Sequence, residues 1–107
     1  MSFDLVREFG TELPDVVDAT TNRGAALKLR GKLLACQAIN KSAEVNSLMV
    51  RMSLDERERL IGAAPDTFYL TDHYRKTPCV LVRLDQITQK ALRQVLESGW
   101  RFMMERA

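Results

Sequence analysis

The chain has few of the residues that support metal, disulfide or catalytic chemistry. It contains one histidine and two cysteines, and the cysteines, Cys36 and Cys79, lie far apart in apolar, strand-like runs. Since no Cys-x-x-Cys pair or His/Cys cluster is present, we expect no metal site. Buried, reduced thiols are the expected state, because structural disulfides are uncommon in cytosolic proteins.

Long apolar runs are also missing. No stretch approaches the ~20 residues that cross a bilayer, and the opening residues, MSFDLVREFG, lack a basic leader followed by an apolar block. We therefore expect a cytoplasmic protein. The sequence also lacks paired carboxylates, a nucleophile with a base at a recognised spacing, and a phosphate-binding glycine loop. These absences predict a protein that is not an enzyme and holds no cofactor.

The composition is that of one globular domain. Hydrophobic residues make up 46% of the 107 residues and charged ones 28%, both ordinary values. We expect a single domain over 1–107 and favour a monomer. A net charge of +2 is too small to indicate nucleic acid by itself. The charge is unevenly distributed, because an acidic segment up to residue 24 precedes a basic segment over 25–54.

Helices are predicted at both ends of the chain. The first begins at the cap residue Ser2 and ends at Leu13, because a residue before proline disfavours the helical region. A serine cap with an acid three residues later begins a short helix at Ser53, whose mixed charges indicate a solvated surface. The last helix begins after Thr88, and its internal Gly99 indicates close packing on a neighbouring element.

Strands fill the middle of the chain. Alternating apolar residues predict them over 25–30, 33–39, 47–52, 68–71 and 79–84, with a weaker one at 16–17. Gly31 fits a tight turn that requires positive φ. The short connections favour antiparallel pairing, so the predicted fold is α+β, with a meandering antiparallel sheet and the N- and C-terminal helices packed on one of its faces.

The stretch PDTFYLTDHYRKTPCVLVRLDQITQKALRQVLESGW contains an aromatic after Pro-x-x, a His-Tyr pair, a Pro-led apolar strand and a helix with a Leu-rich, Trp-ended pattern. These positions are Pro65, Phe68, His73, Tyr74, Pro78, 80–84, Leu92, Leu96 and Trp100. They resemble the MmcQ/YjbR family of small bacterial proteins, and Leu13-Pro14 and Gly31-Lys32 also fit. The chain departs from the family pattern at residues 21–24, where many members carry a Trp-Gly or similar pair.

The resemblance implies a frataxin-like (CyaY-like) two-layer sandwich. It also implies a DNA-binding role, through the "double-wing" arrangement of hairpins that gives the family its usual label. Since this label rests on an analogy of fold, the residues themselves must support any function.

A basic sheet face is the first candidate site. The alternation places cations on the side away from the helices, with another at the hairpin turn and an aromatic beside them; the set is Lys28, Arg30, Lys32, Arg51, Arg83 and Tyr69. Such a surface would neutralise phosphates and stack a base, which predicts weak, sequence-tolerant binding of DNA or RNA. The alternative is that an exposed antiparallel face simply needs polar residues.

Two other segments are weaker candidates. The polar turn that carries His73, Tyr74, Arg75 and Lys76 is either a local turn or a loop that binds a protein or small ligand, and one histidine is thin evidence for catalysis. Asp4, Glu8 and Glu12 share one side of the first helix, as in the weak iron-binding surface of frataxin-like proteins. A solvated helix face is the simpler interpretation of these carboxylates.

Overall fold

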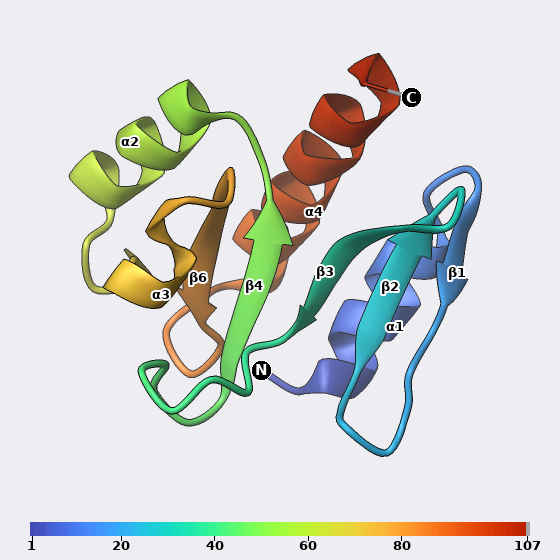
Figure 1. Ribbon diagram of the computed structural model, residues 1–107, viewed down its shortest axis with the longest axis horizontal. Helices are drawn as coiled ribbons and strands as arrows, with labels where there is room; N and C mark the ends of the chain where they lie inside the picture. The colour runs from blue at the N-terminus through green and yellow to red at the C-terminus, as the bar shows by residue number, and fades with distance from the viewer. Residues whose placement is uncertain (107) are drawn as a thin grey trace.

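The computed structural model describes residues 1–106, which form one antiparallel sheet with helices on both faces (Figure 1). The strands are β1 (Val16–Asp18), β2 (Ala26–Leu29), β3 (Lys32–Gln37), β4 (Ser47–Arg51), β5 (Phe68–Tyr69) and β6 (Cys79–Arg83). The helices are α1 (Phe3–Thr11), α2 (Leu54–Ala63), α3 (Asp72–Arg75) and α4 (Gln89–Glu105). Within residues 1–106, none of these helices has the length and apolar character needed to cross a membrane.

The sheet order is β1-β2-β3-β4-β6-β5, and all neighbouring strands are antiparallel. This arrangement, with α1 and α4 on one face, confirms the predicted α+β class. The strands at the two edges are short, three residues in β1 and two in β5. β5 ends two residues earlier than predicted, because the chain turns into α3 directly after it.

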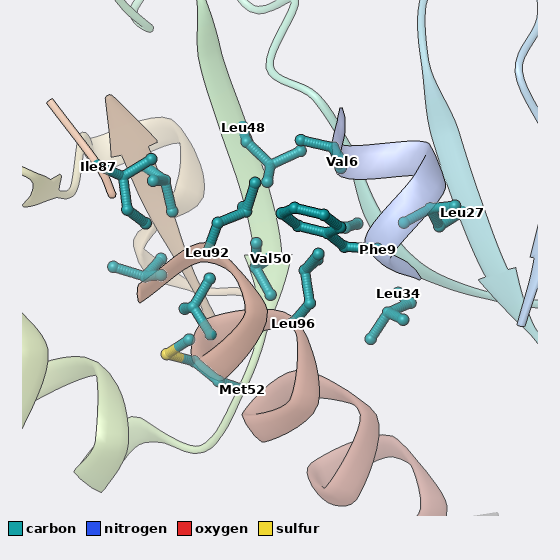
Figure 2. Close-up of a cluster of buried hydrophobic side chains, with 14 of the residues drawn as sticks. Val6, Phe9, Leu27, Leu34, Leu48, Val50, Met52, Ile87, Leu92 and Leu96 are labelled. Carbon is teal, nitrogen blue, oxygen red and sulfur yellow. The ribbon is translucent and has the colours of Figure 1, made fainter. Parts of the chain in front are cut away.

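The main core lies between the sheet and the two terminal helices. Figure 2 shows Val6 and Phe9 of α1 near Leu92 and Leu96 of α4, with Val50 of β4 between the two leucines. All five side chains are at most 6% exposed. The apolar spacing that predicted these helices therefore corresponds to the sides that they bury against one sheet face.

Gly99 brings α4 close to β4. A Cβ atom at this position would lie 2.6 Å from the backbone oxygen of Arg51 and 3.0 Å from Cγ1 of Val50. Real Cβ atoms do not approach a backbone oxygen so closely, so only glycine allows this packing distance. The close packing expected of Gly99 is confirmed.

The β2–β3 hairpin turns at Arg30 and Gly31. Both residues have positive φ, 51° and 82°, as a two-residue turn of type I′ requires. The turn expected at Gly31 is confirmed, but the prediction that Arg30 belongs to the strand is wrong. Strand β2 ends at Leu29, because Arg30 is itself the first of the two turn residues.

Part of the opposite face of the sheet is covered by α3, which was expected to be only a turn. Figure 1 shows this short helix in front of β6. Tyr74 of α3 packs against Met49, Cys79 and Leu81, three buried residues that we call the outer cluster. The sheet is therefore apolar on the inner face and at the centre of the outer face.

Candidate functional site

The outer cluster interrupts the cationic sheet face that the sequence predicted. Alternation does direct Lys28, Arg51 and Arg83 to the outer face. However, Arg51 pairs with Cys79 at one end of the β4–β6 ladder and Arg83 with Ser47 at the other end. Four residues along a strand separate them by about 13 Å, and the outer cluster lies between them. A continuous cationic surface is therefore not formed.

Arg83 and Tyr69 are engaged with neighbouring groups of the protein. The guanidinium of Arg83 donates to both carboxylate oxygens of Glu44, at 2.9 and 2.7 Å, and lies 4.1 Å from the centre of the Tyr69 ring. Its hydrogen bonds hold the pKa of Glu44 below the usual range. The Tyr69 hydroxyl lies 2.6 Å from the Ser47 hydroxyl and accepts from the Glu44 amide. These contacts tie the loop before β4 to the β5–β6 edge.

The predicted cations of the hairpin do not act as one group. Arg30 forms an ion pair with Asp15 at 2.9 Å. Lys32 lies opposite Leu29, which is buried on the helix side, whereas Lys28 faces the outer side. Both lysines are exposed, and no carboxylate within residues 1–106 forms an ion pair with either. The hairpin thus offers two separate cations.

The polar segment around α3 contains one side chain that packs on the sheet and several that are exposed to solvent. The Tyr74 ring is held in the outer cluster and makes an edge-to-face contact with the exposed His73, centroid to centroid 4.8 Å. Burial raises the pKa of Tyr74, and its hydroxyl accepts from the Asn40 amide. Arg75 and Lys76 are exposed and point to a different place, a cleft beside α2.

This cleft is lined mainly by basic side chains, and we call it the basic cleft. It has a volume of about 400 Å³ and lies between the start of α2, the end of α3 and the last turn of α4. It is lined by Ser53, Leu54, Asp55, Arg57, Arg75, Lys76, Pro78, Phe102 and Arg106. Four of these side chains are cations and one is a carboxylate. Arg75 also pairs with Asp72 of α3 at 3.2 Å, so the excess of positive charge that favours an anionic ligand comes from the other cations.

Two further contacts shape the cleft. Arg51 donates from Nε to the backbone oxygen of Pro78 at 3.3 Å, which holds this half-buried cation beside the lining. The guanidinium of Arg106 lies over the Phe102 ring at 4.4 Å. Of the residues predicted from the sequence, the structure thus brings Arg51, Arg75 and Lys76 to one place, although they were assigned to two separate sites.

Arg57 is the residue of this site that sequence reasoning missed. The segment DERER was interpreted as solvated, but the Arg57 side chain is only 7% exposed. Its Nη1 donates to the backbone oxygens of residues 75, 77 and 79, at 3.2 to 3.4 Å. These acceptors are about twenty residues away, so the local charge pattern contained no signal for the burial.

The cysteines lie on the outer face. Burial raises the pKa of Cys79 to about 11 and also raises that of Cys36, so neither thiol is activated as a nucleophile. Cys36 belongs to β3 and Cys79 to β6, with β4 between them. Two strand spacings of about 4.8 Å exceed the Cα separation that a disulfide spans. The thiols are free, though Cys36 is only half-buried.

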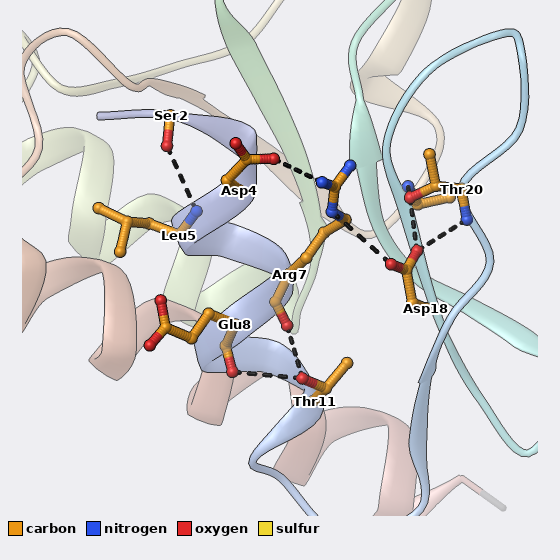
Figure 3. A network of polar contacts seen from close by, with 9 residues as sticks. Ser2, Asp4, Leu5, Arg7, Glu8, Thr11, Asp18 and Thr20 are labelled. Carbon is orange, nitrogen blue, oxygen red and sulfur yellow. Dashed lines mark hydrogen bonds and ion pairs between the residues drawn. The ribbon is translucent and has the colours of Figure 1, made fainter.

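The carboxylates of α1 are largely occupied by arginines. Figure 3 shows Arg7 between Asp4 of its own helix and Asp18 of β1, and Glu12 pairs with Arg93 of α4 at 2.7 Å. Within residues 1–106, no group of three His, Cys, Asp or Glu side chains is placed to hold a metal ion. Asp4 therefore serves a pair within α1, and Glu12 joins the end of this helix to α4.

A solved structure shares this fold. The crystal structure of the Deinococcus radiodurans protein DR2400, described as a DUF419 domain, is similar with a TM-score of 0.72 and 20% sequence identity. The similarity covers 92% of this chain and 75% of that one, and at this identity it shows the fold alone. No family model and no curated protein matches the chain. Membership of the MmcQ/YjbR family stays a prediction.

Proposed function

We propose that the protein is a non-enzymatic nucleic-acid-binding protein of weak, sequence-tolerant affinity, and that its phosphate contacts are made at the basic cleft. The observation that supports this proposal is the collection of four cations around one cleft, Arg57, Arg75, Lys76 and Arg106, against the lining carboxylate of Asp55 and the Asp72 carboxylate that pairs with Arg75. Cations that neutralise phosphates provide affinity without sequence information. The cleft replaces the sheet face as the proposed contact surface.

The dimensions of the helices favour contacts with the phosphate backbone. Reading bases in the major groove usually needs a helix or ribbon that enters the groove with several side chains aimed at base edges. Here α3 has four residues, and α2 carries acids and bases intermixed over ten residues. Side chains at the ends of these helices can reach phosphates. This geometry suits contacts with the nucleic-acid backbone better than contacts with the base edges that carry sequence.

Charge reversal at the cleft tests this proposal. The double variant Lys76→Glu with Arg106→Glu should weaken binding to generic duplex and single strands at low salt. The salt slope of log affinity should also fall by about two ions, near one for each phosphate that the protein no longer neutralises. Fluorescence anisotropy over a series of salt concentrations measures both quantities.

Two variants complete the experiment. Lys41→Glu with Lys90→Glu makes the same charge change at exposed lysines outside the cleft lining, and it should retain most of the affinity. Lys28→Glu with Lys32→Glu measures how much the β2–β3 hairpin contributes to the binding affinity. The proposal fails if the wild-type protein shows no salt-sensitive binding, or if the control variant loses as much affinity as the cleft variant.

A second candidate function is a protein-interaction module. It is favoured by two exposed apolar side chains in the segment between β3 and β4, Ile39 at 62% and Val45 at 95% exposure. A pull-down in which partner enrichment survives nuclease treatment and is lost in Ile39→Ser with Val45→Ser would support it. Enrichment that disappears on nuclease treatment would favour the nucleic-acid proposal.

A further inference from the structure

The basic cleft is lined by apolar side chains as well as by cations. Leu54, the first residue of α2, is 53% exposed although its side chain is large and apolar. The half-buried Pro78 and Phe102 line the same cleft. Apolar side chains in the wall of a pocket favour a ligand that brings apolar surface to them. A ligand that matches this lining therefore has an apolar part beside its anionic groups.

Arg106 adds a planar cation to the lining. Its guanidinium lies over the Phe102 ring, 4.4 Å from the ring centre. From the side opposite the ring, a flat guanidinium can stack on a second flat group. Arg106 and Lys76 are both exposed, and neither forms an ion pair with a carboxylate of residues 1–106. The cleft thus offers one planar cation and one compact cation to a ligand.

A single strand of nucleic acid has both kinds of matching group. Its bases turn out of the stack and present a flat, largely apolar face, and the phosphates on either side are anions. In a duplex the base faces are covered by neighbouring base pairs, so a protein reaches only phosphates, sugars and base edges. The apolar part of the lining can therefore contribute to the binding of a single strand and not to that of a duplex.

We infer that the basic cleft binds single strands in preference to duplexes, with one unstacked base against Leu54 and the Arg106 guanidinium and a neighbouring phosphate at Lys76. This inference rests on the proposed function and narrows its ligand from nucleic acid in general to single strands. Electrostatics alone would give the opposite preference, because a duplex has the higher charge density and attracts cations more strongly. The sign of the preference is therefore diagnostic.

The test uses three probes of equal length: a single strand of mixed sequence, the duplex that contains it, and a strand of abasic sites with the same number of phosphates. Fluorescence anisotropy at one low salt concentration should show the tightest binding for the base-bearing single strand. We expect it to bind about tenfold more tightly than the abasic strand, which corresponds to about 1.4 kcal/mol. The inference is overturned if the duplex or the abasic strand binds as tightly.

The inference and the proposed function fail on different outcomes. If the abasic strand binds as tightly as the base-bearing strand, and both affinities fall with salt, the inference is overturned while the proposed function stands. If none of the three probes shows salt-sensitive binding, the proposed function fails and the inference fails with it.

Variants at exposed positions locate the base contact. Leu54→Ser removes apolar surface without a change of charge, so it should weaken binding of the base-bearing strand severalfold and leave the abasic strand and the salt slope unchanged. Arg106→Lys keeps the charge but loses the planar group, and the same pattern is expected. Ile39→Ser is the matched control, because Ile39 is 62% exposed and lies outside the cleft lining. It should bind all three probes like the wild-type protein. Retention of the wild-type preference for bases in either cleft variant overturns the inference.

Discussion

Replacing Gly99 by alanine measures how tightly α4 is packed on the sheet. In an open helix this substitution stabilises by about 1 kcal/mol, since alanine loses less backbone entropy. At Gly99 the new methyl group would lie 2.6 Å from the backbone oxygen of Arg51 and 3.2 Å from Cδ1 of Leu34. The two effects therefore have opposite signs, and their magnitudes decide the outcome.

The steric effect is the larger. Over-packing a core typically costs about 1–3 kcal/mol. The upper part of this range applies here, because the closest atom belongs to the backbone of β4 and cannot rotate away. With the helix-propensity gain subtracted, we expect Gly99→Ala to lower the free energy of unfolding by about 2 kcal/mol.

Gly62 provides a matched control in the other direction. It lies in α2, is exposed, and a Cβ there would meet no atom within 4 Å. Gly62→Ala should raise the free energy of unfolding by about 1 kcal/mol. Urea unfolding with linear extrapolation measures both variants, and an unchanged m value shows that the comparison holds. If Gly99→Ala is as stable as the wild-type protein, the conclusion that α4 packs closely on β4 at this position is refuted.

Two further predictions concern protons and thiols. Because Arg83 holds the pKa of Glu44 below its ordinary value of 4.5, the pair stabilises the fold above that pH and loses this contribution as the pH falls below it. Glu44→Gln should therefore lose less stability than the wild-type protein between about pH 5 and pH 3 in urea unfolding, and parallel losses would refute the assignment. With the pKa of Cys79 raised to about 11, this thiol should react slowly with a maleimide in the folded protein and rapidly in urea. Mass spectrometry measures the two rates, and equal rates would contradict the burial of the thiol.

Local signals predicted much of the fold. Ser2, Ser53 and Thr88 each accept a hydrogen bond from an amide three residues later, as their positions before apolar or acidic turns indicated. Gly31 and Gly99 were interpreted correctly, Gly31 because its turn needs positive φ and Gly99 because a Cβ atom there would overlap β4. These features depend on residues that are close in sequence, or on the regular spacing of apolar residues along one side of a helix. Both can be recognised in a single sequence.

The site depended on distant contacts and was less predictable. The helix α3 has a single turn, too short for a periodic pattern, so its cover over the outer cluster was missed. Arg83 lies 39 residues from Glu44, which neutralises it. Arg57 is buried by backbone oxygens of a segment that folds over it from residue 75 onward. Alternation along a strand predicts the face on which a charged side chain lies. It does not predict whether a distant part of the chain pairs with that side chain or covers it.

The short strands at the borders of the sheet limit how this protein associates. An edge strand offers unpaired backbone groups on which another chain can extend the sheet, and long, flat edges lead to aggregation. Here β5 contributes two residues and β1 three. These short edges offer few free amides and carbonyls with which an incoming strand could form hydrogen bonds. Growth of the sheet by added copies is thereby disfavoured, and a partner is expected to bind side chains.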